Sequence, residues 1–189
     1  MALEQLKKSV LEVEYDTTRK PLTDFPRKLT AYFAKRFDLN GKMLDIACGR
    51  GEHSQGFHEL GLDVWAVDMT SAAASVYDRK DERFNLWNIG KEPAPFEDNT
   101  FDVVFCKSVI EHVDAEELLN EISRILKPGG KVIILTQDWW YHYRMWYIDH
   151  THGYGVPWMK YSLRNIMLAF GFEDLKVENM YYLEWTWNN

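Results

Sequence analysis

Short apolar segments alternate with helical ones between residues 42 and 136, and this alternation constrains the fold more than any other feature of the sequence. The predicted elements are strands at 42–47, 63–67, 84–87, 101–106 and 131–136, with helices at 52–60, 71–77 and 115–126. Strands that alternate with helices form a parallel sheet with helices packed on both faces. We therefore expect an α/β fold built on a doubly wound, mostly parallel, Rossmann-like sheet.

Further elements are expected on either side of this core. Apolar spacing predicts helices at 3–13, 25–37 and 163–170, and a sixth strand at 175–181. Only residues 182–189 remain after it, and Glu184 to Trp187 alternate polar and apolar side chains as a strand does, but no turn signal separates them from the sixth strand. We expect either a sheet without a complete seventh strand or a chain that is one domain of a longer protein, with the exposed edge covered by a second copy of the chain or by a neighbouring domain.

Composition excludes several classes of protein. The chain has 189 residues, which suits a single domain, and 46 % of them are hydrophobic, which is enough for a core. Its net charge is −7 and its basic residues are scattered, so we expect no nucleic-acid partner. Its apolar runs are short and no secretion signal is visible, so we expect no membrane span. Cys48 and Cys106 lie in apolar contexts, which suits burial in a reducing, cytoplasmic protein.

A glycine-rich turn follows the first predicted strand, from Asp45 to Gly51. Asp68 ends the second strand seventeen residues beyond Gly51, where a carboxylate can accept hydrogen bonds from a ribose diol. Ser54 occupies the place of the third glycine of a dinucleotide site, which disfavours a nicotinamide or nucleotide-sugar enzyme. No lysine with serine or threonine follows the glycines, which excludes a P-loop. The turn therefore favours an adenosine ligand without phosphates.

Five segments resemble the class I S-adenosylmethionine-dependent methyltransferases, and they occur in that family's order. They are the glycine-rich loop at 44–51, the ribose-binding strand end at 67–69, the lead into the fourth strand at 96–104, the stretch after it at 109–113, and the turn at 126–131. The resemblance covers about residues 40–180. It implies the class I methyltransferase fold, with S-adenosylmethionine as cofactor and S-adenosylhomocysteine as product.

The resemblance assigns the glycine-rich loop to the methionine part of the cofactor. The backbone of Ala47, Cys48, Gly49 and Gly51 should approach this part of the ligand. Asp45 should anchor the loop and help to hold the amino group.

The resemblance also assigns residues at the ends of the next strands. Asp68 should bind the ribose hydroxyls, and Met69 should pack on the adenine. Asn88 stands where the family usually has an aspartate that reads the adenine amine, and its amide oxygen can accept the same bond. Lys107 follows the fourth strand, where the chain passes the reactive sulfonium.

The segment 137–160 is long and aromatic, and it follows the carboxyl end of the fifth strand, where α/β sheets bind ligands. Six of the eight tryptophans lie at or after Trp139, which suits either core packing or a wall for a neutral, compact substrate. His152 is the first candidate for a general base, with Asp149 to orient it, and the alternative is that His152 pins the loop.

Two other histidines bear on the chemistry. His112, beside Glu111, is a second candidate base, although a helix-cap or supporting contact is the more ordinary role. His150 and His152 alternate along the chain as metal ligands can, but no third ligand has suitable spacing, so we expect no metal.

The predicted function is methylation of a hydroxyl on a sugar or another small metabolite. The alternatives are N-methylation of a small molecule and a non-catalytic domain that binds the cofactor as a partner subunit. Within the single domain, 1–40 form N-terminal helices, 41–136 the cofactor-binding half, 137–160 the substrate lid, and 161–189 a terminal helix and strand.

Overall fold

The computed structural model describes residues 24–138 and 158–180. The helices are α2 (Asp24–Phe37), α3 (Glu52–Glu59), α4 (Lys80–Arg83), α5 (Ala115–Ile125) and α7 (Lys160–Ala169). The strands are β1 (Lys42–Ile46), β2 (Asp63–Asp68), β3 (Phe84–Leu86), β4 (Phe101–Lys107) and β5 (Leu126–Leu135).

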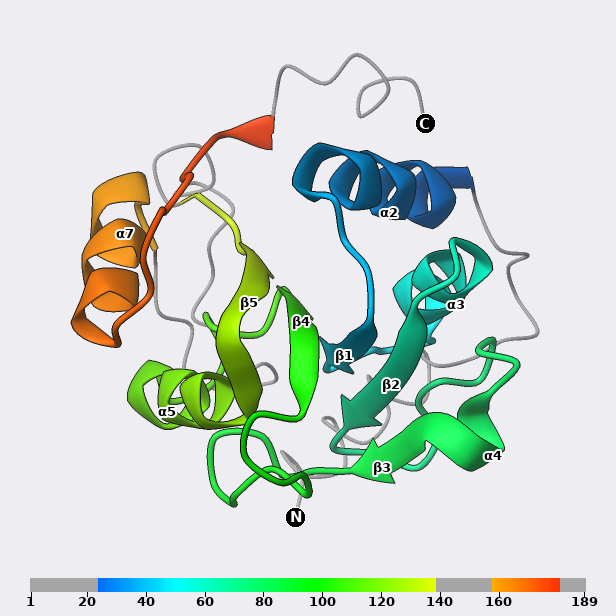
Figure 1. The fold of residues 1–189 in the computed structure, drawn as a ribbon. Helices are drawn as coiled ribbons and strands as arrows, with labels where there is room; N and C mark the ends of the chain where they lie inside the picture. The colour runs from blue at the N-terminus through cyan, green and yellow to red at the C-terminus, as the bar shows by residue number, and fades with distance from the viewer. Residues whose placement is uncertain (1–23, 139–157, 181–189) are drawn as a thin grey trace, which may run out of the picture.

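The five strands form one sheet in the order β3-β2-β1-β4-β5, and every neighbouring pair is parallel (Figure 1). The order reverses between β1 and β4, which makes this sheet doubly wound, as predicted. β5 begins earlier than expected, because Leu126 already pairs with Phe101 before an irregularity shifts the register to Lys131 opposite Val103. Because β1 pairs in parallel with both β2 and β4, the carboxyl ends of these three strands meet at one edge of the sheet.

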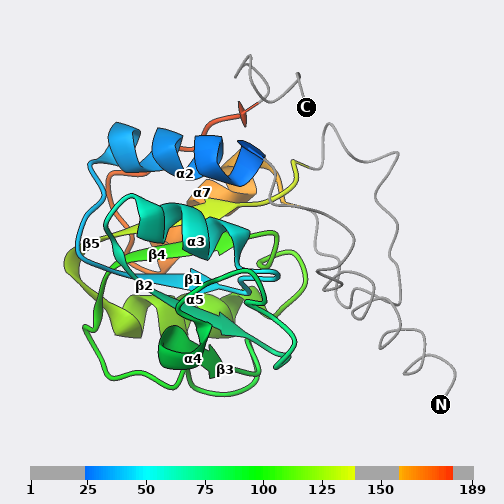
Figure 2. The same cartoon turned by 90° about the vertical axis from the view of Figure 1, so that its right-hand side faces the viewer.

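Helices cover both faces of the sheet, and Figure 2 shows α2 and α3 on one side with α5 on the other. Alternate strand residues separate the two cores. Phe105 on β4 packs with α2 and α3, whereas its neighbour Cys106 packs with α5 and α7. The helix α5 begins at the side chain of Asp114, which accepts hydrogen bonds from the backbone N–H groups of Glu116 and Glu117.

The helix predicted at 71–77 is wrong, because these residues form turns. Two of their backbone donors bond to the glycine-rich loop, and no run of helical hydrogen bonds forms among them. The N–H of Ala74 donates to the carbonyl of Gly49 at 2.7 Å, and the N–H of Val76 donates to that of Arg50 at 3.0 Å. Ala74 also has a φ of 56°, which no helix interior accommodates.

The sixth strand predicted at 175–181 is also wrong over its described part, since residues 175–180 contain no strand. Leu175 packs against the cluster on the α5 face, and Met180 packs against the cluster on the α2 face. This segment therefore crosses the outer edge of β5 instead of pairing along it, and its path beside β5 can be followed in Figure 1. Within the described residues the sheet has neither a sixth nor a seventh strand.

Other expectations have simpler outcomes. Residues 3–13 lie outside the described part of the chain. The helix expected at 25–37 is α2, and the helix expected at 163–170 begins three residues earlier, at Lys160. Over residues 24–138 and 158–180, no helix is both long and apolar enough to cross a bilayer.

Candidate active site

The candidate site lies where β1, β2 and β4 end. The sheet brings together the loop after β1, Asp68 at the end of β2 and Lys107 at the end of β4. In open α/β sheets this edge, beside the reversal of strand order, is where ligands bind.

The loop after β1 turns sharply because three of its residues adopt positive φ: Ala47 at 53°, Gly49 at 54° and Gly51 at 84°. A Cβ on Gly51 would lie 2.9 Å from the Cβ of Tyr77 and 3.0 Å from the Cα of Ala74. Glycine at 51 thus permits both the left-handed turn and close packing against 74–77.

Asp68 is buried, with 5 % of its surface exposed, and its carboxylate holds the loop in place. One oxygen accepts a hydrogen bond from the N–H of Gly49 at 3.1 Å, and the other accepts from the N–H of Thr70 at 3.3 Å. Each carboxylate oxygen retains further acceptor capacity, so these contacts are compatible with hydrogen bonds from a diol.

Asp45 is almost completely buried at the end of β1 and accepts a hydrogen bond from the hydroxyl of Ser54 at 2.6 Å. Burial raises its pKa to about 7, while the Ser54 hydrogen bond and the charge of Lys107 act in the opposite direction. Ser54, in the place of a third glycine, therefore ties α3 to β1 through this carboxyl group.

The two residues predicted to contact the adenine, Met69 and Asn88, follow the carboxyl ends of β2 and β3. Met69 directly follows Asp68 and is 60 % exposed, which is unusual for a large apolar side chain. Asn88 is half-buried in the turn after β3, where its carbonyl accepts hydrogen bonds from the N–H groups of Lys91 and Glu92.

Both cysteines are buried, as expected. Cys48 is 7 % exposed and Cys106 is fully buried. Burial raises the pKa of each thiol far above its usual range, so neither provides a thiolate.

His53 is a candidate site residue that the sequence analysis did not single out. It lies in the first turn of α3, with its ring centroid 5.5 Å from that of Phe105. Its Nε2 is buried and has no hydrogen-bond partner in the described part of the protein. Burial, and secondarily the charge of Lys107, lowers the pKa of His53 to about 4, so the imidazole is neutral at pH 7. Its position two residues beyond Gly51 was the available signal.

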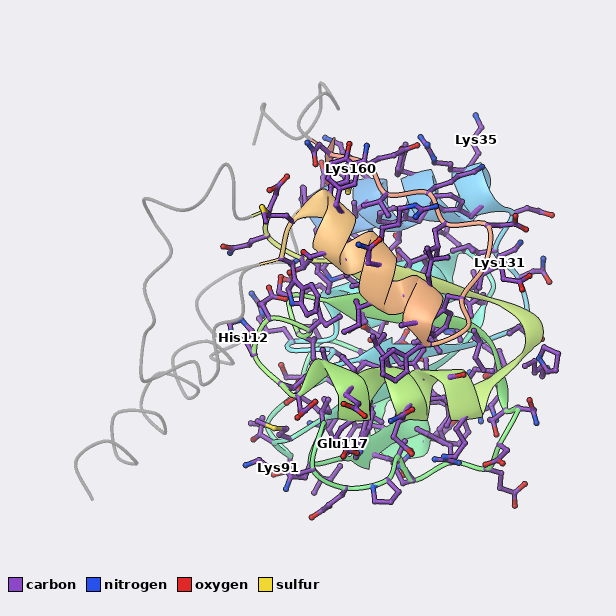
Figure 3. All side chains as sticks on the ribbon, turned by 90° about the vertical axis from the view of Figure 1, so that its left-hand side faces the viewer. Lys35, Lys91, His112, Glu117, Lys131 and Lys160 are labelled. Atoms are coloured by element: carbon purple, nitrogen blue, oxygen red, sulfur yellow. The ribbon has the colours of Figure 1, made fainter. Side chains whose placement is uncertain are left out.

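His112 lies in the connection between β4 and α5. Figure 3 places it at the opposite end of the molecule from Lys131, at the end where α5 begins. Its Nε2 is 4.0 Å from the nearest carboxylate oxygen of Glu111, which is itself buried. The other Glu111 oxygen accepts a hydrogen bond from the hydroxyl of Thr136 at 2.9 Å, which joins this connection to the end of β5.

His142, Asp149, His150 and His152 lie outside the described residues. The two ends of the segment that contains them meet, because Asp138 and Trp158 form a parallel bridge. Trp158 is buried, and its indole N–H donates to the carbonyl of Ile110 at 3.3 Å, so this tryptophan belongs to the core. Among residues 24–138 and 158–180, no group of three or more ligating side chains could hold a metal ion.

The residues at this edge fit S-adenosylmethionine in chemical type. Buried carboxylates at Asp68 and Asp45 match a ribose diol and an amino group, and the exposed Met69 offers an apolar surface. His53 adds a buried Nε2 without a hydrogen-bond partner among the described residues, and Lys107 adds a positive charge.

Comparison with known proteins agrees with this reading. Residues 44–134 match the methyltransferase domain family. The chain is 38 % identical over 151 residues to phosphoethanolamine N-methyltransferase 2 of Caenorhabditis elegans, a match that covers 73 % of this chain and 34 % of that protein. It is 30 % identical over 129 residues to the ubiquinone biosynthesis O-methyltransferase of Xanthomonas oryzae pv. oryzae, a match that covers 64 % of this chain and 54 % of that protein.

A solved S-adenosylmethionine-dependent methyltransferase from Archaeoglobus fulgidus shares 27 % identity and a TM-score of 0.62 with this chain, over 79 % of this chain and 71 % of that one. The chain spans about a third and about half of the lengths of the two curated relatives. Fold, glycine-rich loop and relatives agree, and the chain belongs to the class I S-adenosylmethionine-dependent methyltransferases.

Proposed function

We propose that this protein transfers a methyl group from S-adenosylmethionine to a small molecule, with a hydroxyl of a sugar or another small metabolite as the first candidate acceptor. The observation that supports this most directly is the meeting of the glycine-rich loop with two buried carboxylates, Asp45 and Asp68, at one sheet edge. The cofactor supplies a methyl group that is already activated on a sulfonium.

In this proposal each side chain at the edge binds one part of the cofactor. Asp68 accepts hydrogen bonds from the ribose while its contacts to Gly49 and Thr70 keep it in place. Asp45 and the backbone at 47–51 hold the amino-acid part, Met69 packs on the adenine, and Asn88 accepts from the adenine amine. Lys107 lies beside the amino-acid part at the end of β4.

A hydroxyl acceptor needs a base that removes its proton during attack. We propose His152 for this role, oriented by Asp149, with His112 as the second candidate. His152→Ala should keep the affinity for S-adenosylhomocysteine and lower turnover by roughly 10²–10⁴. Full activity in this variant would return His152 to a structural role and make His112→Ala the next test.

N-methylation is the alternative, and the 38 % identity to an N-methyltransferase favours it. An amine acceptor needs only to be unprotonated, so His152→Ala would then have little effect on turnover. A third function, a non-catalytic subunit, would retain cofactor binding without transfer to any acceptor.

The test of the cofactor site is Asp68→Ala with S-adenosylhomocysteine, measured by calorimetry. The variant loses charge-assisted hydrogen bonds worth roughly 1.5–3 kcal/mol each, so its affinity should fall at least about tenfold. Asp63→Ala is the matched control, because Asp63 is exposed at the opposite end of β2. Equal affinities in the two folded variants would reject the ribose assignment. Transfer of a labelled methyl group to a panel of hydroxylated metabolites and amines then identifies the acceptor class.

A further inference from the structure

Glu111 is a buried carboxylate that the cofactor assignments do not use. It lies in the turn that connects β4 to α5, and only 1 % of it is exposed. One of its oxygens accepts a hydrogen bond from the hydroxyl of Thr136 at 2.9 Å, and the other lies 4.0 Å from Nε2 of His112. Within the described residues no lysine or arginine pairs with it. A buried charge without such a partner is costly, so this carboxylate calls for an explanation other than stability.

Two hydrogen bonds fix this connection to the end of β5. The backbone N–H of Ser108 donates to the carbonyl of Leu135 at 2.8 Å, and the hydroxyl of Thr136 donates to Glu111. The side chain of Ile110, directly before Glu111, is fully buried and anchors the turn in the core. The Glu111 carboxylate therefore has a fixed position at the carboxyl end of the sheet, where the candidate site lies.

His112 is the group on which this carboxylate can act. Its side chain is 33 % exposed, so a ligand can reach it, whereas Glu111 beside it is closed to solvent. Figure 3 shows His112 at the end of the molecule where α5 begins. The 4.0 Å between Nε2 and the carboxylate is longer than a hydrogen bond, but an opposite charge at this distance favours the charged form of its neighbour.

We infer that Glu111 is a positioning residue that acts through His112: it keeps the imidazole at the edge of the site and stabilises the imidazolium that forms when the ring takes a proton. This inference rests on the proposed function and gives the second candidate base a buried partner. As an acceptor oxygen bonds to the methyl carbon, the carbon–sulfur electron pair stays on sulfur and the hydroxyl proton passes to His112. Glu111 keeps its charge throughout and takes no proton itself.

Glu111→Gln removes the charge and keeps the shape, and its amide oxygen can still accept the Thr136 hydroxyl. With the acceptor that the metabolite panel identifies, kcat should fall by about 5–50-fold. The acceptor KM and the affinity for S-adenosylhomocysteine should stay within about twofold of the wild type, and the melting temperature should not fall. A purely structural role predicts wild-type kcat for this variant, since the hydrogen bond survives.

Glu117→Gln is the matched control. It removes an exposed carboxylate in the first turn of α5 (Figure 3), and it should leave kcat unchanged.

A double-variant cycle shows whether Glu111 acts through the imidazole. His112→Asn alone should lower kcat by roughly 10²–10⁴, and adding Glu111→Gln should then cost less than about twofold more. Thr136→Val leaves the charge but frees the carboxylate, so it should lower kcat by about 2–5-fold, and it takes the place of Glu111→Gln in the cycle if that variant does not fold. Multiplying effects, or wild-type kcat in folded Glu111→Gln or His112→Asn, would overturn the inference.

A measurement without turnover separates this inference from the proposed function. Diethyl pyrocarbonate acylates the neutral imidazole, and mass spectrometry of the His112 peptide gives the rate. At about pH 6, loss of the neighbouring charge leaves more of the ring neutral, so Glu111→Gln should react at least about threefold faster than the wild type and Glu117→Gln at the wild-type rate. Equal rates in Glu111→Gln and the wild type reject the inference. Absence of methyl transfer to every acceptor tested rejects the proposed function instead, and the rates at His112 then decide alone whether the two side chains are paired.

Discussion

At the scale of single residues, Asp45 makes stability depend on pH. Its pKa of about 7 in the folded protein exceeds the ordinary value of 3.8 because the carboxyl group is buried. The folded state therefore binds the proton more tightly than the unfolded state, and the stability that this provides is present below about pH 4 and lost as pH rises through 7. Asp45→Asn, which cannot ionise, should show a flatter melting temperature between pH 5 and 8. Parallel curves for variant and wild type would contradict this.

The site residues differ in how far the sequence predicts them. Asp45 and the glycines form one contiguous motif, and Asp68 directly ends a strand, so local patterns suffice to find them. His53 and Lys107 are 54 positions apart, and only the pairing of β1 with β4 and the packing of α3 bring them together. Lys107 could be found from its place directly after the fourth strand, whereas the role of His53 becomes visible only when α3 packs its ring against Phe105.

At the scale of elements, Arg124 on α5 fixes the connection between β3 and β4. Its guanidinium donates to the carbonyls of Phe96 at 2.8 Å and Ala94 at 3.1 Å, and it pairs with Asp98 and Glu121. Arg124→Met should lower stability by about 2–3 kcal/mol, since several part-buried acceptors lose their donor. That loss corresponds to roughly 4–12 °C of melting temperature for a chain of this size.

Arg79→Met is the control for Arg124, because Arg79 pairs with Glu82 on the surface and makes no comparable set of bonds. An exposed ion pair of this kind contributes little to stability, because water screens the two charges. Equal melting temperatures in the two variants would show that the connection is not held by Arg124.

Elements with strong periodicity could be predicted, and those set by tertiary contacts could not. α5 combines an apolar face with an Asp114 cap, so the sequence alone locates it to within one residue. The residues 71–77 have reasonable helical character, but hydrogen bonds to Gly49 and Arg50 override it. Local helix propensity predicts structure only weakly where another segment supplies hydrogen-bond acceptors for the backbone.

At the scale of the whole molecule, the chain after α7 covers the outer edge of β5 and connects the two faces of the sheet. Leu175 packs on the α5 face, and Met180 packs on the α2 face. The Glu178 carboxylate accepts hydrogen bonds at 2.6 Å from the Arg36 guanidinium on α2. An unpaired strand edge invites pairing with another chain, so this crossing protects the sheet within the described residues.

This arrangement predicts that apolar packing, rather than the ion pair, holds the crossing in place. Leu175→Asp puts a charge into a half-buried apolar contact, so it should lower stability by about 1–3 kcal/mol and promote self-association through the uncovered β5 edge. Glu178→Gln removes only an exposed ion pair, whose partners are 36 % and 52 % exposed, so it should cost less than about 1 kcal/mol and leave association unchanged. Melting curves and light scattering over a concentration series measure both effects. If Glu178→Gln proves as damaging as Leu175→Asp, or if Leu175→Asp stays as monodisperse as the wild type, the crossing is not what shields this edge.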